Sequence, residues 1–263
     1  MNNNESMSFQ TAIIIGGSGG IGEAIVLSLF ERGYEKVYVV DRVSPKNDDS
    51  RIEWIQLDLS TDRVGVLTYL VDEIDSLVIT AGIGRLDRFS SFDAGELEKT
   101  MHINAIAPIE VLQLFSSRLS SERPFYASVI TSIAALVSSP LYAVYSASKG
   151  ALSRYVEAVN AELAGEGLPN RILEVAPGRI DGTGFHGGEQ RGPEPLMPLA
   201  SEIVDAMFAR KCRFVPNGEV YEGVIARYQA DPEAFGVSSY QYKLDNSALE
   251  PRRKAKIGYL SGT

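Results

Sequence analysis

The sequence is poor in cross-linking and metal-binding side chains. Its 263 residues include one cysteine, Cys212, and two histidines, His102 and His186. A single thiol cannot form an intrachain disulfide, and the two histidines do not form a ligand pair. We therefore expect a protein whose stability and chemistry depend on neither disulfides nor metal ions.

Long apolar runs and basic surfaces are also missing. No stretch approaches the ~20 apolar residues that span a bilayer, and the polar start, residues 1–10, has no signal-peptide core. The net charge is −9, and the basic cluster at 250–256 is a short terminal run, which disfavours binding to a phosphate backbone. We expect a cytoplasmic protein with a small-molecule partner and with no nucleic-acid or membrane partner.

The apolar residues, 44% of the chain, fall into short runs separated by helical patterns. Continuous runs rich in isoleucine and valine are typical of parallel strands that are buried on both faces. The expected strands are 11–16, 36–41, 52–58, 76–82, 127–132 and 171–177, and the expected helices are 21–32, 63–73, 97–119, 145–163 and 201–211. This alternation predicts one α/β domain over 1–263, a doubly wound, Rossmann-like parallel sheet with helices on both faces.

Two segments depart from the alternation. Residues 181–198 contain five glycines and three prolines, which excludes a regular element. We predict a substrate lid over 181–211 that ends in a helix capped by Ser201. The segment 212–263 is aromatic and atypical, and two roles fit it: a cover for the substrate pocket or a subunit contact.

Glycines gather between the first strand and the first helix, in IIIGGSGGIG (13–22). Glycine permits a tight turn and lets the backbone approach a pyrophosphate at the positive end of a helix, although a purely structural turn fits as well. The predicted cofactor contacts in this loop are Gly16, Ser18, Gly20, Ile21 and Gly22. We interpret Gly17 and Gly19 as loop flexibility.

Asp41 ends the second expected strand. A carboxylate there accepts hydrogen bonds from both hydroxyls of an adenosine ribose and repels a 2′-phosphate. Arg42 follows directly and is able to pair with such a phosphate, so NADP remains the alternative. Because the glycine loop itself has no lysine or arginine, we predict NAD.

Tyr145 and Lys149 lie four residues apart in YSASKGA, which places them on one face of a helix. A nearby ammonium lowers the pKa of a phenol, and a phenol so tuned exchanges protons with an alcohol or carbonyl oxygen. Ser132, at the end of the fifth expected strand, is placed to hold the reacting oxygen. Each residue also has a plain structural reading, as a surface pair or a strand-end cap.

Taken in their order along the chain, these motifs resemble those of the short-chain dehydrogenase/reductase family over residues 10–185. The resemblance implies that Ser132, Tyr145 and Lys149 are catalytic. It adds Asn104 of HINAIAP, which in the family holds a water that connects the lysine to solvent. It also implies that Tyr145 and Lys149 contact the cofactor, and that the protein forms a homodimer or homotetramer.

The resemblance implies further cofactor contacts. Asp58 matches the family's adenine-binding acid, and TAGIG (80–84) matches a turn that lines the cofactor, with Thr80 in an asparagine position. APGRIDGTG matches the segment that flanks the nicotinamide, although its threonine comes one residue late. The contacts implied by these two segments are Ala81, Gly82, Pro177, Gly178, Ile180 and Thr183.

Three functions fit these observations. The first is hydride transfer between NAD(H) and an alcohol or ketone through the Ser–Tyr–Lys–Asn site. The others are an NADP(H)-dependent carbonyl reductase and a dinucleotide-binding regulatory protein without turnover. The complete set of four site residues favours an enzyme, because a sensor needs only the cofactor loop.

Overall fold

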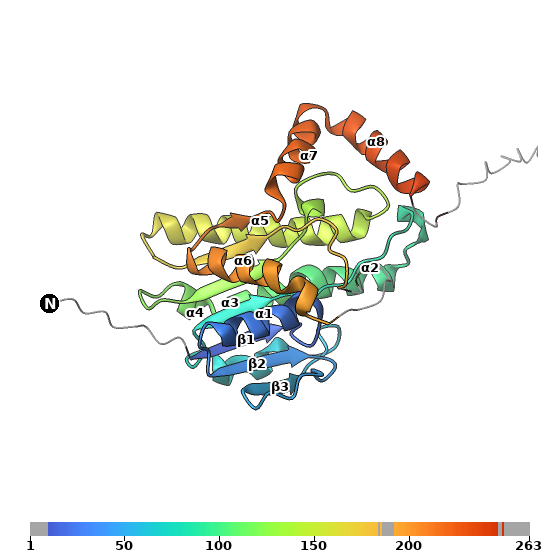
Figure 1. The fold of residues 1–263 in the computed structure, drawn as a ribbon. Coiled ribbons are helices and arrows are strands. Elements are labelled where there is room, and N and C mark those ends of the chain that lie inside the picture. Colours follow the sequence, from blue (N-terminus) through green and yellow to red (C-terminus); the bar gives the residue numbers. More distant parts are fainter. Residues whose placement is uncertain (1–9, 184, 186–191, 247–248, 250–263) are drawn as a thin grey trace, which may run out of the picture.

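The protein is built on one parallel sheet of seven strands, in the order β3-β2-β1-β4-β5-β6-β7 (Figure 1). The computed structural model describes residues 10–183, 185, 192–246 and 249. The strands are β1 (Thr11–Ile15), β2 (Lys36–Asp41), β3 (Ile52–Gln56), β4 (Ser76–Ile79), β5 (Tyr126–Ile130), β6 (Arg171–Val175) and β7 (Arg213–Phe214). The doubly wound α/β prediction is confirmed, and β7 is a strand that the sequence did not predict.

The strand order reverses at β1, which lies between β2 and β4. Ligands of doubly wound sheets gather at the carboxyl ends of the strands beside such a reversal. The glycine loop follows β1, Asp41 ends β2, and the 80–84 turn follows β4. The fold therefore brings three predicted cofactor segments to one edge of the sheet.

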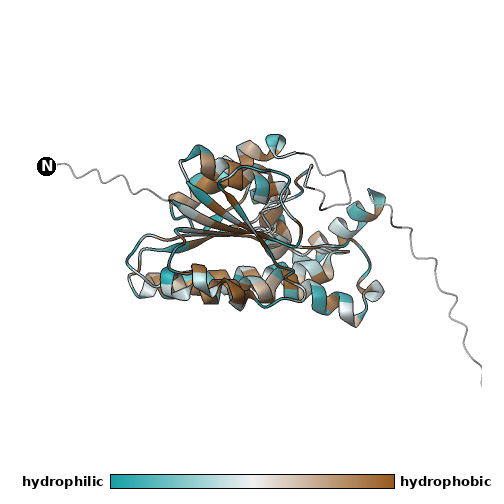
Figure 2. Ribbon diagram, turned by 90° about the horizontal axis from the view of Figure 1, so that it is seen from below, coloured by the Kyte–Doolittle hydropathy of each residue, from teal (hydrophilic) through white to brown (hydrophobic). Residues whose placement is uncertain are grey.

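Hydrophobic cores lie on both faces of the sheet, as the layers in Figure 2 show. Because side chains alternate along a strand, the adjacent Ile13 and Ile14 are buried in opposite cores. One face is covered by α1 (Gly20–Glu31) and α6 (Met197–Phe208), which pack against each other. The other is covered by α3 (Ala107–Leu114), α5 (Ala143–Gly165) and the 3₁₀ helix η1 (Val64–Leu70).

Some predicted helices have different boundaries. The helix predicted at 97–119 is divided into α2 (Ala94–Met101), the π-helical turn η3 (His102–Ile106), α3 and α4 (Ser116–Leu119). The helix predicted at 63–73 is the 3₁₀ helix η1. Short 3₁₀ turns also occur at η2 (Phe89–Ser91), η4 (Ile133–Ala135) and η5 (Glu194–Leu196). Ser201 was wrongly predicted as a cap, since α6 begins at Met197 and Ser201 Oγ accepts a 2.9 Å hydrogen bond from Arg32.

The C-terminal segment forms a hairpin of two helices, α7 (Gly218–Ala230) and α8 (Pro232–Asp245), beyond the layers that cover the sheet (Figure 1). Neither helix, each described over its full length, contains a buried residue. Hydrogen bonds connect the hairpin to the loop before α5. Lys243 Nζ donates to Ser139 Oγ at 2.7 Å and to the Pro140 carbonyl at 2.9 Å. The sequence predicted neither helix.

Within the described part of the chain, no helix is both long and apolar enough to cross a membrane. The same residues contain no group of three or more histidine, cysteine or carboxylate side chains that could hold a metal ion. His186 and the basic cluster at 250–256 lie outside the described residues, as does part of the predicted lid, at 184 and 186–191.

Candidate active site

The turn between β1 and α1 requires glycine for two different reasons. Gly16 and Gly20 have φ values of +90° and +56°, in the left-handed region that favours glycine. A side chain on Gly22 would overlap the carbonyl oxygen of Gly16. Among the described residues, no side chain caps the start of α1. Its first N–H groups are therefore left for an anion such as a pyrophosphate.

Gly17 is a packing position, so its interpretation as loop flexibility was wrong. The residue is buried, and a Cβ atom there would lie 3.1 Å from Val39 Cγ1 and 3.2 Å from Ile14 Cβ. Separations this short require the neighbouring side chains to shift before a Cβ atom fits. Gly17 thus brings the loop down onto the sheet.

Thr80 connects the glycine loop to the neighbouring strand. Its hydroxyl donates hydrogen bonds to the carbonyl oxygens of Ile15, at 3.2 Å, and Gly16, at 2.9 Å. A side chain on Gly16 would contact the backbone of Ala81 at 2.6 Å. The 80–82 turn therefore lies directly against the loop, and threonine provides the link in the position where the family commonly has asparagine.

The Asp41 carboxylate forms a hydrogen bond with the backbone of the glycine loop. It accepts hydrogen bonds from the backbone N–H of Ser18 at 3.1 Å and of Val43 at 3.3 Å. Asp58 follows β3, and its carboxylate accepts hydrogen bonds from Ser60 Oγ and from the Ser60 N–H, at 2.7 and 2.8 Å. These two bonds hold the pKa of Asp58 below its usual range. Both predicted acids lie at the carboxyl ends of neighbouring strands.

Tyr145 lies close to Ser132. Tyr145 is in the first turn of α5, and the Ser132 side chain is near enough to act on the pKa of its phenol. Ser132 lies two residues beyond β5 rather than at its end, because it caps η4 by accepting a 3.1 Å hydrogen bond from the Ala134 N–H. Lys149 lies one helical turn after Tyr145, is 3% exposed, and donates a 2.8 Å hydrogen bond to the Ile130 carbonyl.

Burial dominates the protonation of both titratable groups. It raises the pKa of Tyr145 to about 12, and the nearby Ser132 side chain opposes this rise. Burial lowers the pKa of Lys149 to about 8. The pKa of Tyr145 is therefore raised overall rather than lowered toward neutrality, because the loss of solvation around the phenol outweighs the other influences on it.

The side chain of Asn104 binds the 82–84 turn. Its Nδ2 donates to the Ile83 carbonyl at 2.7 Å, and its Oδ1 accepts from the Ile83 N–H at 2.8 Å. A third bond runs from Nδ2 to Ser148 Oγ at 3.0 Å. Asn104 lies in the π-helical turn η3, a kind of turn that is frequent at functional sites. The water that the family resemblance implies at Asn104 stays a prediction.

The turn at Pro177 joins Ser132 to the C-terminal hairpin. The Pro177 carbonyl accepts a 2.9 Å hydrogen bond from the Ile133 N–H and a long one, 3.4 Å, from Ser132 Oγ. A side chain on Gly178 would overlap the hydroxyl of Tyr221, a residue of α7. Sequence reasoning missed Tyr221, since no local pattern connects residues 43 positions apart.

The chain after this turn returns to the glycine loop. Ile180 packs against the core beneath α1 and α6. Thr183 donates a 3.1 Å hydrogen bond to the Ile180 carbonyl, and its Cα lies 3.7 Å from the Cβ position of Gly20. The predicted contacts at 177–183 therefore lie between the Tyr145 site and the start of α1.

Two aromatic rings adjoin Tyr145. The ring centroids of Tyr142 and Phe185 lie 5.8 and 5.3 Å from that of Tyr145. Lys243 Nζ lies 5.2 Å from the Tyr142 centroid, and burial lowers the pKa of Lys243 to about 8. Lys243 and Tyr221 therefore connect the C-terminal hairpin to the loop before α5 and to Gly178, and the two roles considered for the C-terminal segment stay predictions.

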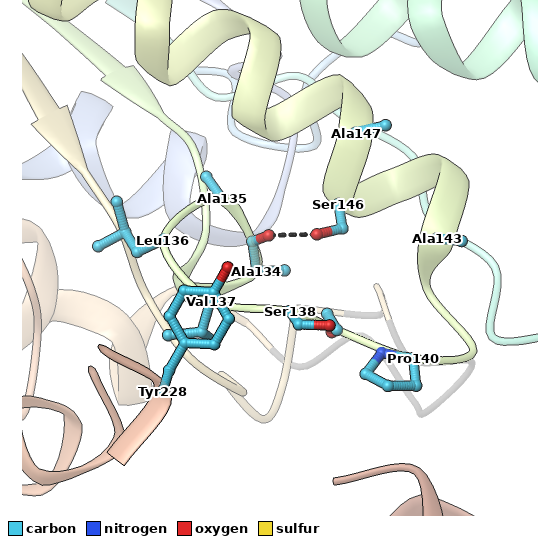
Figure 3. Close-up of a pocket in the computed structure, with 11 residues that line it drawn as sticks. Ala134, Ala135, Leu136, Val137, Ser138, Pro140, Ala143, Ser146, Ala147 and Tyr228 are labelled. Carbon is cyan, nitrogen blue, oxygen red and sulfur yellow. Dashed lines mark hydrogen bonds between the residues drawn. The ribbon is translucent and has the colours of Figure 1, made fainter. Parts of the chain in front are cut away.

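A cavity of about 410 Å³ lies beside this site (Figure 3). Its walls are the 134–140 loop, the start of α5 and Tyr228 of α7. Ser146, which donates a hydrogen bond to the Ala134 carbonyl, lines the cavity, whereas its neighbour Tyr145 does not. The cavity therefore adjoins Tyr145 and Ser132, and neither residue lines it.

Comparisons with known proteins agree with this geometry. A family model described as short chain dehydrogenase matches residues 10–192. An uncharacterized oxidoreductase of Saccharomyces cerevisiae, TDA5, is 29% identical over 225 residues, which are 80% of this chain and 67% of the yeast protein.

Solved structures share the fold. A short chain dehydrogenase from Burkholderia cenocepacia in complex with NADP has a TM-score of 0.68 at 24% identity, over 89% of this chain and 99% of that one. A 4-hydroxyisoleucine dehydrogenase complexed with NADH and succinate has a TM-score of 0.58 at 22% identity, over 78% of this chain and 96% of that one. Proteins of this architecture thus occur with either dinucleotide.

Proposed function

This chain belongs to the short-chain dehydrogenase family of oxidoreductases, and on that premise we propose that it transfers a hydride between NAD(H) and an alcohol or ketone. The proposed catalytic residues are Asn104, Ser132, Tyr145 and Lys149. The main support is the proximity of Ser132 and Tyr145 at the carboxyl edge of the sheet, one helical turn from a buried lysine. A homodimer or homotetramer and a cytoplasmic location stay predictions.

The glycine loop suits a nicotinamide dinucleotide, because Gly16 and Gly22 have no space for side chains and α1 begins without a side-chain cap among the described residues. When bound, the dinucleotide supplies or accepts the hydride. The residues proposed to hold it are Gly16, Ser18, Gly20, Ile21, Gly22, Asp41, Asp58, Ala81, Gly82, Tyr145, Lys149, Pro177, Gly178, Ile180 and Thr183.

The chain's own residues move the proton. In ketone reduction, Tyr145 donates its phenolic proton to the carbonyl oxygen while the Ser132 hydroxyl donates a hydrogen bond to the same atom. The Lys149 ammonium then stabilises the phenolate that remains. In alcohol oxidation, the phenolate accepts the alcohol proton. With a pKa of about 12, Tyr145 is protonated at neutral pH, so this structure favours its role as the proton donor.

An assay panel tests the proposed function. Purified protein is offered ketones with NADH or NADPH, and secondary alcohols with NAD or NADP, while the absorbance of the reduced nicotinamide is followed. We expect turnover with at least one ketone and a preference for NADH. Tight cofactor binding without turnover of any ketone or alcohol would instead favour the regulatory alternative.

Asp41 should set the cofactor preference. In Asp41→Asn, the amide oxygen still accepts the Ser18 N–H, while the charge that repels a 2′-phosphate is lost. Since like charges in contact cost several kcal/mol, the ratio of NADH to NADPH affinity should shift toward NADPH by about tenfold or more. Fluorescence titration of both cofactors measures the ratio.

Asp48→Asn is the matched control, because it removes the same charge from an exposed position in the connection after β2. We expect this variant to keep the wild-type ratio. Tighter binding of NADPH than of NADH by the wild-type protein would overturn our interpretation of Asp41.

Reduction should also depend on the protonation of Lys149. Its pKa of about 8 lies below the Tyr145 pKa of about 12, so the ammonium loses its proton first as the pH rises. We expect kcat/KM for a ketone to stay level below about pH 8 and to fall above it, because the positive charge that stabilises the phenolate disappears. A pH series measures this, and a level profile up to about pH 10 would contradict it.

A further inference from the structure

Because Gly84 has no side chain, there is space beside Tyr145, and the ring of Phe185 occupies this space. A Cβ atom on Gly84 would lie 2.5 Å from Phe185 Cζ, 3.0 Å from Phe185 Cε1 and 3.1 Å from Tyr145 Cδ2. The Phe185 and Tyr145 ring centroids are 5.3 Å apart, with 55° between the ring planes. The three residues therefore pack as a unit in which glycine provides the space for an aromatic ring.

Space, rather than backbone conformation, accounts for glycine at position 84. Its φ is not among the positive values found at Gly16, Gly20, Gly33, Gly167 and Gly182. Alanine is therefore compatible with the backbone at this position, and the atoms nearest to its methyl group would belong to the two neighbouring rings. A substitution at Gly84 thus acts first on these rings.

The Phe185 ring lies where a substrate has to pass. The Phe185 N–H donates a 3.4 Å hydrogen bond to Thr183 Oγ1, and Thr183 lies beside Gly20 of the cofactor loop. Two residues further along, the ring of Phe185 lies against the proposed proton donor, Tyr145. A ketone that receives a proton from Tyr145 and a hydride from the cofactor must place its carbonyl carbon between these two groups. One of its substituents then lies beside Phe185.

We propose that Phe185 is a specificity-determining residue, which limits the bulk that a ketone can carry next to its reacting carbonyl carbon. This inference rests on the proposed function and deepens it by naming the substrate class. Flat or unbranched substituents fit beside the ring, and substituents branched at the carbon next to the carbonyl do not.

Two aryl ketones test the proposal. Acetophenone and phenyl tert-butyl ketone carry the same aryl group and differ in three methyl groups next to the carbonyl. We expect Phe185→Ala to raise the ratio of kcat/KM for the bulky ketone to that for the small one by about tenfold or more, since one or two methyl groups in a closed pocket already change rates by that factor.

Two variants control this measurement. Phe185→Leu keeps part of the bulk and should change the ratio less than Phe185→Ala does. Phe89→Ala removes a phenylalanine that is 74% exposed, and should keep the wild-type ratio. An unchanged ratio in Phe185→Ala would overturn the proposal.

A second measurement needs no turnover. Gly84→Ala either strains or displaces the Phe185 ring, so it should lower the Tm of the protein by about 2 °C or more. In the Phe185→Ala background the same substitution should lower the Tm by less than half as much, because the ring it conflicts with is gone. Equal decreases in both backgrounds would show that Gly84 and Phe185 do not interact and would overturn the proposal.

The two measurements separate this inference from the proposed function. The Tm measurements could show that Gly84 and Phe185 interact while the wild-type protein reduces no ketone with either cofactor. That result would overturn the proposed function, and with it the proposed role of Phe185 in substrate selectivity. A protein that reduces acetophenone but keeps its selectivity in Phe185→Ala would overturn only the inference about Phe185.

Discussion

Replacement of Tyr145 by phenylalanine is expected to lower kcat for ketone reduction by about 10³-fold, while the affinity for NADH stays within a few-fold of wild type. A positioned general acid typically contributes a factor of about 10²–10⁴ to a rate, and phenylalanine has no proton to donate. The ring itself remains, so its packing against Tyr142 and Phe185 is retained. The loss therefore falls on the chemical step and not on the structure of the site.

Steady-state turnover and a cofactor titration on the same preparation check this result. Tyr155→Phe is the matched control, because Tyr155 lies in the same helix, α5, outside the proposed site, and the substitution removes the same atom. We expect the control to keep wild-type turnover. Undiminished turnover in Tyr145→Phe would overturn the mechanism.

Replacement of Lys149 by methionine should lower kcat by about 10²-fold or more. It should also raise the free energy of unfolding at neutral pH. The pKa of Lys149 is about 8 in the folded protein and 10.5 ordinarily. Holding the charged form in the folded state at pH 7 therefore costs about 3 kcal/mol. Methionine removes that cost and loses the hydrogen bond from the charged ammonium to Ile130, worth about 2 kcal/mol. The net gain in the free energy of unfolding is about 1 kcal/mol.

The pH dependence of stability provides the check. Between pH 8 and pH 10.5 the unfolded chain binds a proton at Lys149 that the folded protein does not, so the stability of the wild-type protein rises with pH across this window. The advantage of Lys149→Met should therefore be largest below pH 8 and shrink above it. Urea unfolding at several pH values measures it, with Lys211→Met, an exposed lysine, as the control. A methionine variant less stable than wild type at pH 7 would show that the lysine stabilises the fold.

The sheet and part of the candidate site could be predicted because their patterns are local. Buried parallel strands are continuous apolar runs, and the spacing of Tyr145 and Lys149 is one helical turn. Ser132 was predicted as the last residue of a strand, whereas β5 ends two residues earlier, at Ile130, and strand ends are less sharply marked in a sequence than strand interiors. The π-helical turn at Asn104 has no comparable local pattern, so the sequence predicted an unbroken helix there.

The rest depends on contacts between distant parts of the chain. Neither α7 nor α8 contains a buried residue, so the two helices lie outside the alternation of buried strands and helices from which the other elements were predicted. The pKa of Tyr145 depends on how deeply the surrounding elements bury it, and sequence reasoning considered only the neighbouring lysine. The role of Gly84 could not be predicted from the sequence, because it depends on a contact with Phe185, which lies about 100 positions away along the chain.

The C-terminal hairpin has a consequence for how this protein can diverge. Because α7 and α8 contribute nothing to either core, most substitutions in them cost little folding free energy. Yet Tyr221 and Lys243 extend from these helices to Gly178 and to the loop before α5. Substitutions in the hairpin are therefore expected to alter these contacts beside the candidate site at little cost to the stability of the sheet and its cofactor edge.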